Sequence, residues 1–247
     1  MAHDVFPRSA RAEGDFAHLC RLARPHYTHD DPAHDWPHIE RVLAWAERIG
    51  RAEGAQVAVL RAAVVLHDLV NLPKDHPQRL QASQMCAAAA APLLRQAGYD
   101  PALIPAIQAA IVEHSYSLGR PPSSLEAAIL QDADRLDALG AVGLMRAVST
   151  GARMARRFYD PADPFAHDRP LDQRRQTIDH VFTKLLRLPD QMNTATARAE
   201  AETRAAFLRV FVDQLAGEVA PAHPGPQAPT HDTGTGGAGG TRPAGSG

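Results

Sequence analysis

The residues with the clearest potential for chemistry are a histidine and an aspartate side by side at the end of an apolar run. The run, Ala-Ala-Val-Val-Leu at residues 62–66, leads directly into His67 and Asp68. Its composition is that of a buried helix, where a carboxylate needs a compensating partner. Imidazole and carboxylate are both metal ligands, so a divalent cation between them would satisfy both side chains. The sequence therefore predicts a metal site here.

A stretch before this dyad offers a further histidine in a helical position. Asp35 is a suitable N-cap, and Pro37 fits the first helical turn, where its missing N–H costs little. His38 then shares one helix face with Val42 and Ile49. We therefore expect its ring to point inward, toward the same core as the dyad.

A stretch after the dyad offers two aspartates as a last ligand. Asp134 lies on the helix face of Leu130 and Ala138. Asp132 lies on nearly the opposite side, with Leu136. A carboxylate on either apolar face would be buried and would need a partner. Periodicity alone leaves both aspartates open.

Together these stretches resemble the signature of the HD-domain metal-dependent phosphohydrolases, which is a lone histidine, an adjacent His-Asp pair and a distant aspartate on separate helices. The likeness is closest to a bacterial subgroup similar to small nucleotide pyrophosphohydrolases, and it covers residues 33–217. A His-Asp dipeptide is a weak signal by itself, whereas four blocks in order are specific. The blocks are His-Asp-Trp-Pro-His-Ile-Glu-Arg-Val at 34–42, Leu-His-Asp-Leu-Val-Asn-Leu-Pro-Lys-Asp-His-Pro at 66–77, Glu-His-Ser-Tyr-Ser at 113–117 and Gln-Asp-Ala-Asp-Arg-Leu-Asp-Ala-Leu-Gly-Ala at 131–141.

The resemblance implies four metal ligands, which are His38, His67, Asp68 and Asp134. It favours Asp134 because the family places its last ligand in an Ala-Asp-Arg-Leu pattern, and Asp132 is kept as the alternative. Asp68 can contact both the metal and the attacking water, so we also assign it a catalytic role.

His114, in the Glu-His-Ser block, is the second candidate catalytic residue. It stands at the end of a predicted helix, and three interpretations stay open: a further metal ligand, a proton donor, and a histidine favoured by the helix dipole. Asp137, one turn after the last expected ligand, is placed to hold a ligand or Arg41 in position.

Five side chains are expected to bind a phosphorylated substrate by charge or hydrogen bonding, namely Arg41, Lys74, His76, Arg169 and Lys184. Lys74 and His76 lie in a proline-rich loop directly after the dyad. Arg169 lies in a long loop at residues 158–172 that is a candidate lid. Lys184 lies within reach of the inward face of the helix that follows.

The mixed nitrogen and oxygen donor set favours a divalent transition metal, with Mn²⁺ as the first expectation and Mg²⁺, Co²⁺, Ni²⁺, Fe²⁺ or Zn²⁺ as alternatives. With no cysteine in the set, a structural zinc site is disfavoured. The resemblance implies hydrolysis of nucleoside triphosphates to monophosphate and pyrophosphate. The alternatives are a nucleoside monophosphate phosphatase and a catalytically silent ligand sensor.

These residues must be positioned by helices, because alanine, leucine and arginine are abundant while aromatic residues make up only 5%. We predict an all-α protein with one HD-type helical bundle at residues 11–219. A loose lead at 1–10 precedes it, and a disordered tail rich in proline, glycine and threonine follows at 220–247. Helices are expected at residues 14–24, 37–51, 56–70, 79–97 with a kink or restart near Pro92, 101–113, 125–139, 140–154, 171–187 and 194–218.

Charge and targeting signals exclude several classes of partner. A formal net charge of -2 disfavours binding of a nucleic-acid polymer. The two cysteines, Cys20 and Cys86, show no pairing pattern, and the sequence has neither an apolar leader nor a run of about 20 apolar residues. We expect a cytoplasmic protein without a membrane partner, and the sequence does not predict its oligomeric state.

Overall fold

The structure is a computed structural model that describes residues 14–27, 34–72, 76–115, 119 and 121–220. Over these residues the protein is all-α, and its one β-type contact is an isolated bridge between Arg157 and Gln176. The α-helices are α1 (Phe16–Ala23), α2 (Trp36–Glu53), α3 (Val57–Leu66), α4 (Ala82–Gln96), α5 (Ile104–Glu113), α6 (Leu125–Asp137), α7 (Gly140–Arg153), α8 (Thr177–Thr183) and α9 (Ala195–Val219). The predicted fold class is confirmed.

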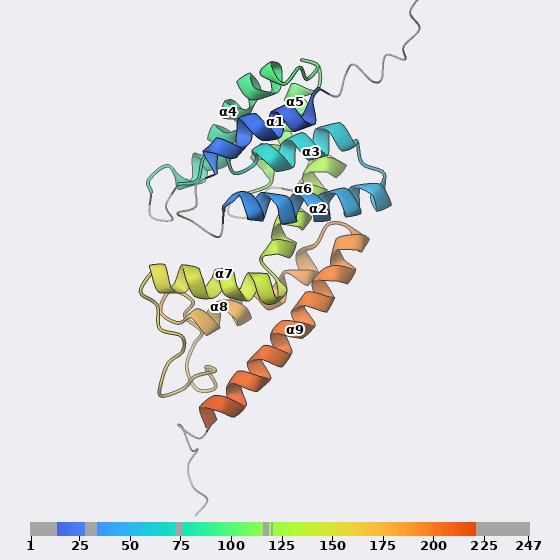
Figure 1. The fold of residues 1–247 in the computed structure, drawn as a ribbon. Coiled ribbons are helices and arrows are strands. Elements are labelled where there is room, and N and C mark those ends of the chain that lie inside the picture. Colours follow the sequence, from blue (N-terminus) through green and yellow to red (C-terminus); the bar gives the residue numbers. More distant parts are fainter. Residues whose placement is uncertain (1–13, 28–33, 73–75, 116–118, 120, 221–247) are drawn as a thin grey trace, which may run out of the picture.

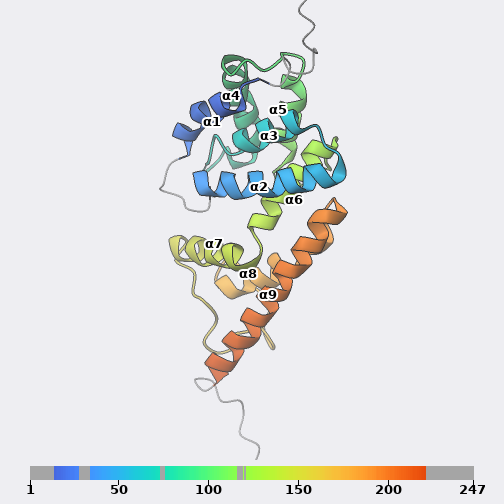
Figure 2. The same ribbon diagram turned by 45° about the vertical axis from the view of Figure 1, so that its right-hand side comes forward.

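The helices form two lobes (Figure 1). The first lobe contains α1 to α6, and the second lobe contains α7, α8 and α9. Helix α6 passes behind α2 and leads down into α7, and the long helix α9 runs diagonally along the second lobe, as the turned view also shows (Figure 2). The core is continuous, because buried apolar residues of both lobes form one cluster.

Helix α3 lies at the centre of the first lobe because its sequence is apolar on every side. Of its last seven residues all except Arg61 are buried, and Arg61 is the one charged residue of the helix. A helix of this kind can be stable only inside a core. Whatever follows its last residue therefore emerges within the protein interior.

Two predicted helices are shorter than expected. The helix expected at 56–70 ends at Leu66, because the His67 Nδ1–H donates a hydrogen bond of 2.7 Å to the carbonyl oxygen of Val64. The helix expected at 171–187 is reduced to α8 and a 3₁₀ turn at Leu185–Arg187. Residues before α8 are held instead by Asp179, whose carboxylate accepts the Asp172 N–H at 2.6 Å. Local side-chain bonds thus replaced helical ones.

Several other boundaries follow the predicted signals, although α4 and α5 each begin three residues later than expected, at Ala82 and Ile104. Asp35 caps α2, Gly54 ends it in the left-handed conformation at φ +81°, and Ser124 caps α6. Pro92 lies inside α4 without dividing it. Within the described ranges, no helix combines the length and the apolar character that a membrane crossing requires. The expected lead, the tail after Ala220 and Lys74 lie outside the described residues.

Candidate metal centre

His38, in the first turn of α2, is held by one hydrogen bond to its backbone and by another to its ring. The carboxylate of Asp35 accepts a hydrogen bond of 2.9 Å from the His38 backbone N–H. The ring is fully buried, and its Nδ1 donates to Asp137 Oδ2 at 2.8 Å. A carboxylate at Nδ1 places the proton there, so the lone pair of the neutral ring is on Nε2.

His67 and Asp68 follow the last residue of α3 directly. The His67 ring is fully buried, and because its Nδ1 bonds the carbonyl oxygen of Val64, its Nε2 also carries the lone pair. Asp68 is less enclosed, with 19% of its side chain exposed. The dyad therefore joins a buried nitrogen donor to a carboxylate that solvent or substrate can reach.

The two aspartates of α6 have separate environments. Asp134 Oδ1 lies 3.6 Å from His38 Nε2. Asp132 is fully buried on the other side of the helix, where it accepts the backbone N–H groups of Asn193 and Thr194, both at 2.8 Å. Asp132 thus anchors the segment that leads into α9, and Asp134 is the aspartate beside the histidines.

His38, His67 and Asp134 bring ligand atoms within 4.8 Å of one another, and Asp68 lies beside both histidines. His38 Nε2 lies 3.7 Å from Asp68 Oδ2, and His67 Nε2 lies 3.6 Å from the same oxygen. Such separations are too long for hydrogen bonds, but they leave room for a cation between the atoms. Among the described residues, both Nε2 atoms are buried without a hydrogen-bond partner. Unpaired buried polar atoms are costly, so the arrangement fits a metal that binds both nitrogens.

The protonation states suit a metal as well. Burial lowers the pKa of His38, which keeps its ring neutral. Burial by itself would raise the pKa of Asp68, but the neighbouring histidines, His67 foremost, outweigh it and hold the pKa well below its usual range. For Asp134, burial would again raise the pKa, but His38, His67 and Arg146 together outweigh it and lower the pKa. Neutral imidazoles and ionised carboxylates are the forms that bind divalent cations.

His114 lies at the edge of this cluster, just after α5. Its Nδ1 bonds the carbonyl oxygen of Ile111 at 2.5 Å, and its Nε2 lies 3.9 Å from Asp68 Oδ1. Its ring centroid is 4.9 Å from that of His67. His67, Asp68 and His114 therefore form a second possible ligand group beside His38, His67 and Asp134. Both groups need the single free nitrogen of His67, so they cannot be filled by separate ions at the same time.

Behind His38, a carboxylate is clamped by two arginines. Asp137 is 3% exposed, and its Oδ1 accepts Arg41 Nε at 2.6 Å. Its Oδ2 accepts hydrogen bonds from His38, from Arg146 of α7 at 2.6 Å and from Arg41 Nη2 at 3.1 Å. These bonds outweigh burial and hold the pKa of Asp137 well below its usual range. The sequence predicted the place of Asp137 but missed Arg146, whose only signal is a lone charge in the small apolar stretch 140–148.

The residues expected to bind substrate are placed differently from one another. Arg41 and its ion-pair partner Asp137 both line a cavity of about 260 Å³. Lys184, at the end of α8, is close enough to Asp134 for the two charges to interact, although burial lowers its pKa. His76 lies in the loop after the dyad, where its Nδ1 accepts the Gln78 N–H at 3.1 Å.

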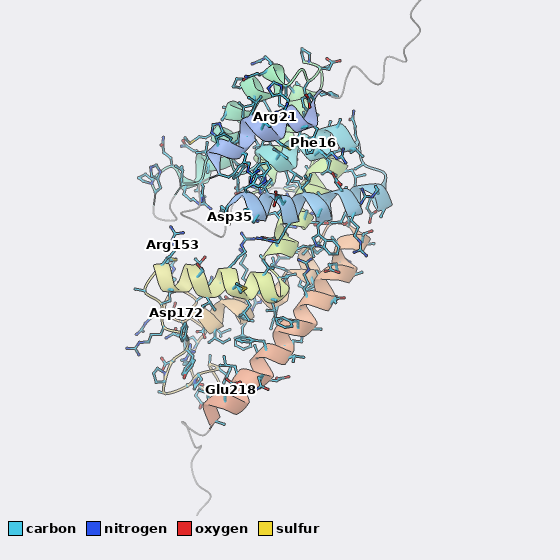
Figure 3. All side chains as sticks on the ribbon, in the orientation of Figure 1. Phe16, Arg21, Asp35, Arg153, Asp172 and Glu218 are labelled. Carbon is cyan, nitrogen blue, oxygen red and sulfur yellow. The ribbon has the colours of Figure 1, made fainter. Side chains whose placement is uncertain are left out.

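Arg169 is not brought to the cluster by any contact that the structure shows. It forms a two-pronged ion pair with the fully buried Asp179, at 2.6 and 2.9 Å. Its loop is further fixed by Asp163, which accepts the N–H groups of three successive residues, 167–169. Asp172, near the end of this loop, lies on the side of α7 away from α2 (Figure 3). The candidate lid thus packs on the second lobe.

Comparisons with known proteins agree with this arrangement. A family model described as the HD domain matches residues 36–139, the span from the first residue of α2 to the last residue before α7. The uncharacterized protein YpgQ of Bacillus subtilis (strain 168) is 35% identical over 189 residues, which is 76% of this chain and 85% of YpgQ. The match to YpgQ is long enough to include residues of both lobes.

Solved structures show the same fold. The structure of Bacillus subtilis YpgQ in complex with ADP has a TM-score of 0.64 and 28% identity, and the match covers 87% of this chain and 97% of that one. A Lactobacillus plantarum protein has a TM-score of 0.66 and 30% identity, over 84% and 97% of the two chains. An HD-superfamily hydrolase from Bacillus thuringiensis has a TM-score of 0.64 and 28% identity, over 82% and 95%.

Proposed function

The chain belongs to the HD-domain superfamily of hydrolases, and on this basis we propose that it is a metal-dependent phosphohydrolase that converts nucleoside triphosphates to monophosphates and pyrophosphate. One observation carries the proposal, which is the pair of buried and unpaired Nε2 atoms of His38 and His67. Both face the carboxylates of Asp68 and Asp134. We propose these four residues as the metal ligands, with Mn²⁺ as the preferred ion.

The chain's own groups are suited to activate a water. A bound divalent ion supplies Lewis acidity, which polarises a phosphoryl oxygen and makes a nearby water more acidic. Asp68 turns its Oδ2 toward His38 and His67 and its Oδ1 toward His114, so it can orient a water with the oxygen that is not shared by the first two histidines. We propose that this is its catalytic role.

His114 is proposed to move the proton. Its Nδ1 is engaged with the backbone of Ile111, so its Nε2 offers a lone pair to the space beside Asp68. Burial lowers the pKa of His114 and keeps the ring neutral near pH 7. A neutral imidazole can accept a proton from the attacking water and return it to the leaving oxygen.

The charge of the site supports a polyanionic substrate. Three carboxylates around it, those of Asp68, Asp134 and Asp137, are matched by the cations Arg41, Arg146 and Lys184. Addition of a divalent ion makes the whole region positive, which attracts a triphosphate.

The structural relative YpgQ was solved in complex with ADP, which supports a nucleotide as the substrate of this chain. We propose that Lys184, Arg41 and His76 contact its phosphates, together with Lys74 from the loop after the dyad. Arg169 is tied to Asp179 and is the weakest of the expected substrate contacts.

Product analysis tests this proposal. Metal-free protein is incubated with nucleoside mono-, di- and triphosphates and with Mn²⁺, Mg²⁺, Co²⁺ or no added metal, and the products are separated by anion exchange. Monophosphate plus pyrophosphate is the expected result. Orthophosphate plus nucleoside would indicate a nucleoside monophosphate phosphatase instead. If no metal supports turnover while nucleotides still bind, the protein is a ligand sensor.

A further inference from the structure

Arg146 on α7 reaches out of the second lobe to the back of the metal centre. Its NH1 donates to Asp137 Oδ2 at 2.6 Å, and that oxygen also accepts the Nδ1–H of His38 at 2.8 Å. We infer that Arg146 is a positioning residue, which fixes Asp137 and thereby sets the ring of His38 for metal binding. This inference rests on the metal site proposed above.

The orientation of His38 depends on Asp137, because the ring donates its Nδ1–H to that carboxylate, while Arg146 Nη1, at 3.4 Å from the same nitrogen, is itself a donor and cannot accept the proton. Nδ1 is the atom that holds the proton, and Nε2 must stay unpaired to bind a metal. Asp137 in turn is 3% exposed, so water cannot hold its carboxylate in place. The groups that bind a ligand histidine are known to affect metal affinity strongly, because they fix its ring and its tautomer.

Arg146 differs from Arg41, the other arginine at Asp137, in the element that carries it. His38 and Arg41 are both on α2, so the bond from Arg41 keeps Asp137 aligned with α2 alone. Arg146 belongs to the second lobe and donates to the oxygen that His38 uses at 2.6 Å, whereas Arg41 reaches that oxygen only with a longer bond of 3.1 Å. The position of α7 therefore affects, through Arg146, the orientation of Asp137 and His38, although the proposed ligands all come from the first lobe.

Two glycines set how closely α7 approaches. A side chain at Gly143 would bring its Cβ to 2.1 Å from the backbone oxygen of Ala138, just beyond the end of α6. A Cβ at Gly151 would lie 2.2 Å from Thr177 Oγ1 at the start of α8. The contact at Gly143 is with backbone that cannot move aside, so only glycine lets α7 begin this close to the end of α6, whereas at Gly151 the side chain of Thr177 would have to shift. The close approach is what brings Arg146 within hydrogen-bond distance of Asp137.

The test measures Mn²⁺ binding by the otherwise metal-free protein, by calorimetry and by the loss of the free-ion signal in electron paramagnetic resonance. We expect R146M to weaken Mn²⁺ binding about tenfold, as is usual for removal of a group that orients a ligand. R146K should recover part of the affinity, because lysine supplies the charge but not the planar fork. R153M removes the same charge from the far end of α7 (Figure 3) and should bind as the wild type does.

A second variant moves α7 without touching an arginine. G143A should push α7 away from α6 and weaken Mn²⁺ binding in the same direction as R146M. Thermal unfolding of each variant without metal provides the comparison, since a residue with only a structural role would lower the melting temperature and leave the affinity of the folded protein unchanged.

The outcomes separate this inference from the proposed function. If the wild type binds no divalent metal, the metal site itself is wrong. If the wild type binds Mn²⁺ and the folded R146M and R146K variants bind it as tightly as the wild type does, the metal site stands and the role of Arg146 is refuted. Should R146M fail to fold, R146K and G143A still decide the question.

Discussion

Two clusters of aspartates, one in each lobe, differ in whether the polar atoms around them have hydrogen-bond partners. In the second lobe, Asp179 is fully buried and accepts both terminal nitrogens of Arg169 and the backbone N–H of Asp172. In the first lobe, the cluster around Asp68 leaves the Nε2 atoms of two buried histidines without partners.

The difference shows which buried polar residues signal function. A carboxylate whose oxygens are all used by the chain, like that of Asp179, stabilises a loop and has nothing left for a ligand. Asp132 belongs to the same kind, although it stands two residues from Asp134. Unpaired atoms that face one another are retained at a cost in stability, which a bound cation removes.

The largest expected effect comes from the unpaired cluster. Asp68→Asn should lower kcat by roughly 10³-fold, since a metal contributes several kcal/mol to the transition state. Helix content, followed by circular dichroism, should be unchanged, because Asp68 follows α3 and is partly exposed. Asp190→Asn, at an exposed position, is the control and should keep full activity. Full activity in Asp68→Asn would remove Asp68 from the proposed mechanism.

The paired cluster should give the converse result. Asp179→Ala leaves the Arg169 guanidinium without its partner and should lower the free energy of unfolding by about 3 kcal/mol, as loss of one side of a buried ion pair does. The Mn²⁺ affinity of the folded protein should not change. Denaturant unfolding measures the first effect, and Asp213→Ala at an exposed site is the matched control. A loss of metal affinity would contradict the separation of the two clusters.

The pH dependence of folding stability should also distinguish the two clusters. Because burial lowers the pKa values of His38 and His114 from 6.5, the unfolded chain takes up protons at a higher pH than the folded chain does. The contribution of these two histidines to stability is complete above pH 6.5 and is lost as the pH falls toward their pKa values in the folded protein. The lowered pKa values of Asp68 and Asp134 act in the same direction, but only below about pH 4.

The free energy of unfolding of the metal-free protein should therefore decline as pH falls from about 8 to about 5. The decline should reach up to about 1.4 kcal/mol per pH unit for each histidine. His114→Gln should flatten the profile, whereas Asp179→Ala should shift it without changing its slope. A profile that His114→Gln leaves unchanged would show that this ring is protonated equally in both states.

The smallest effect is expected at the contact between the lobes. Lys184→Met removes a cation beside Asp134 and should raise KM for a triphosphate about tenfold, which corresponds to about 1.4 kcal/mol. The value of kcat should change less if the lysine binds ground-state phosphate. Lys184→Arg keeps the charge and should keep most of the affinity. An unchanged KM in the methionine variant would show that the substrate does not reach α8.

The sequence by itself determined the elements whose signals are local. The caps Asp35 and Ser124 and the stop at Gly54 fix helix ends through bonds or backbone angles within a few residues. Composition was sufficient for the all-α class and for the buried position of α3. The four proposed ligands were readable because their types and order are a pattern along the chain, although their meeting point was only an expectation.

Tertiary structure decided the side-chain contacts between different elements, whether these are near or distant in the sequence. It separated Asp134 from Asp132, because the partners of Asp132 come from residues 61 and 62 positions away. It gave Arg169 to Asp179, although its loop is long enough to have been a lid. It brought Arg146 to Asp137 across the interface between α6 and α7. Helical periodicity places a side chain on a face, but only packing determines which polar atoms meet a partner and which are left for a ligand.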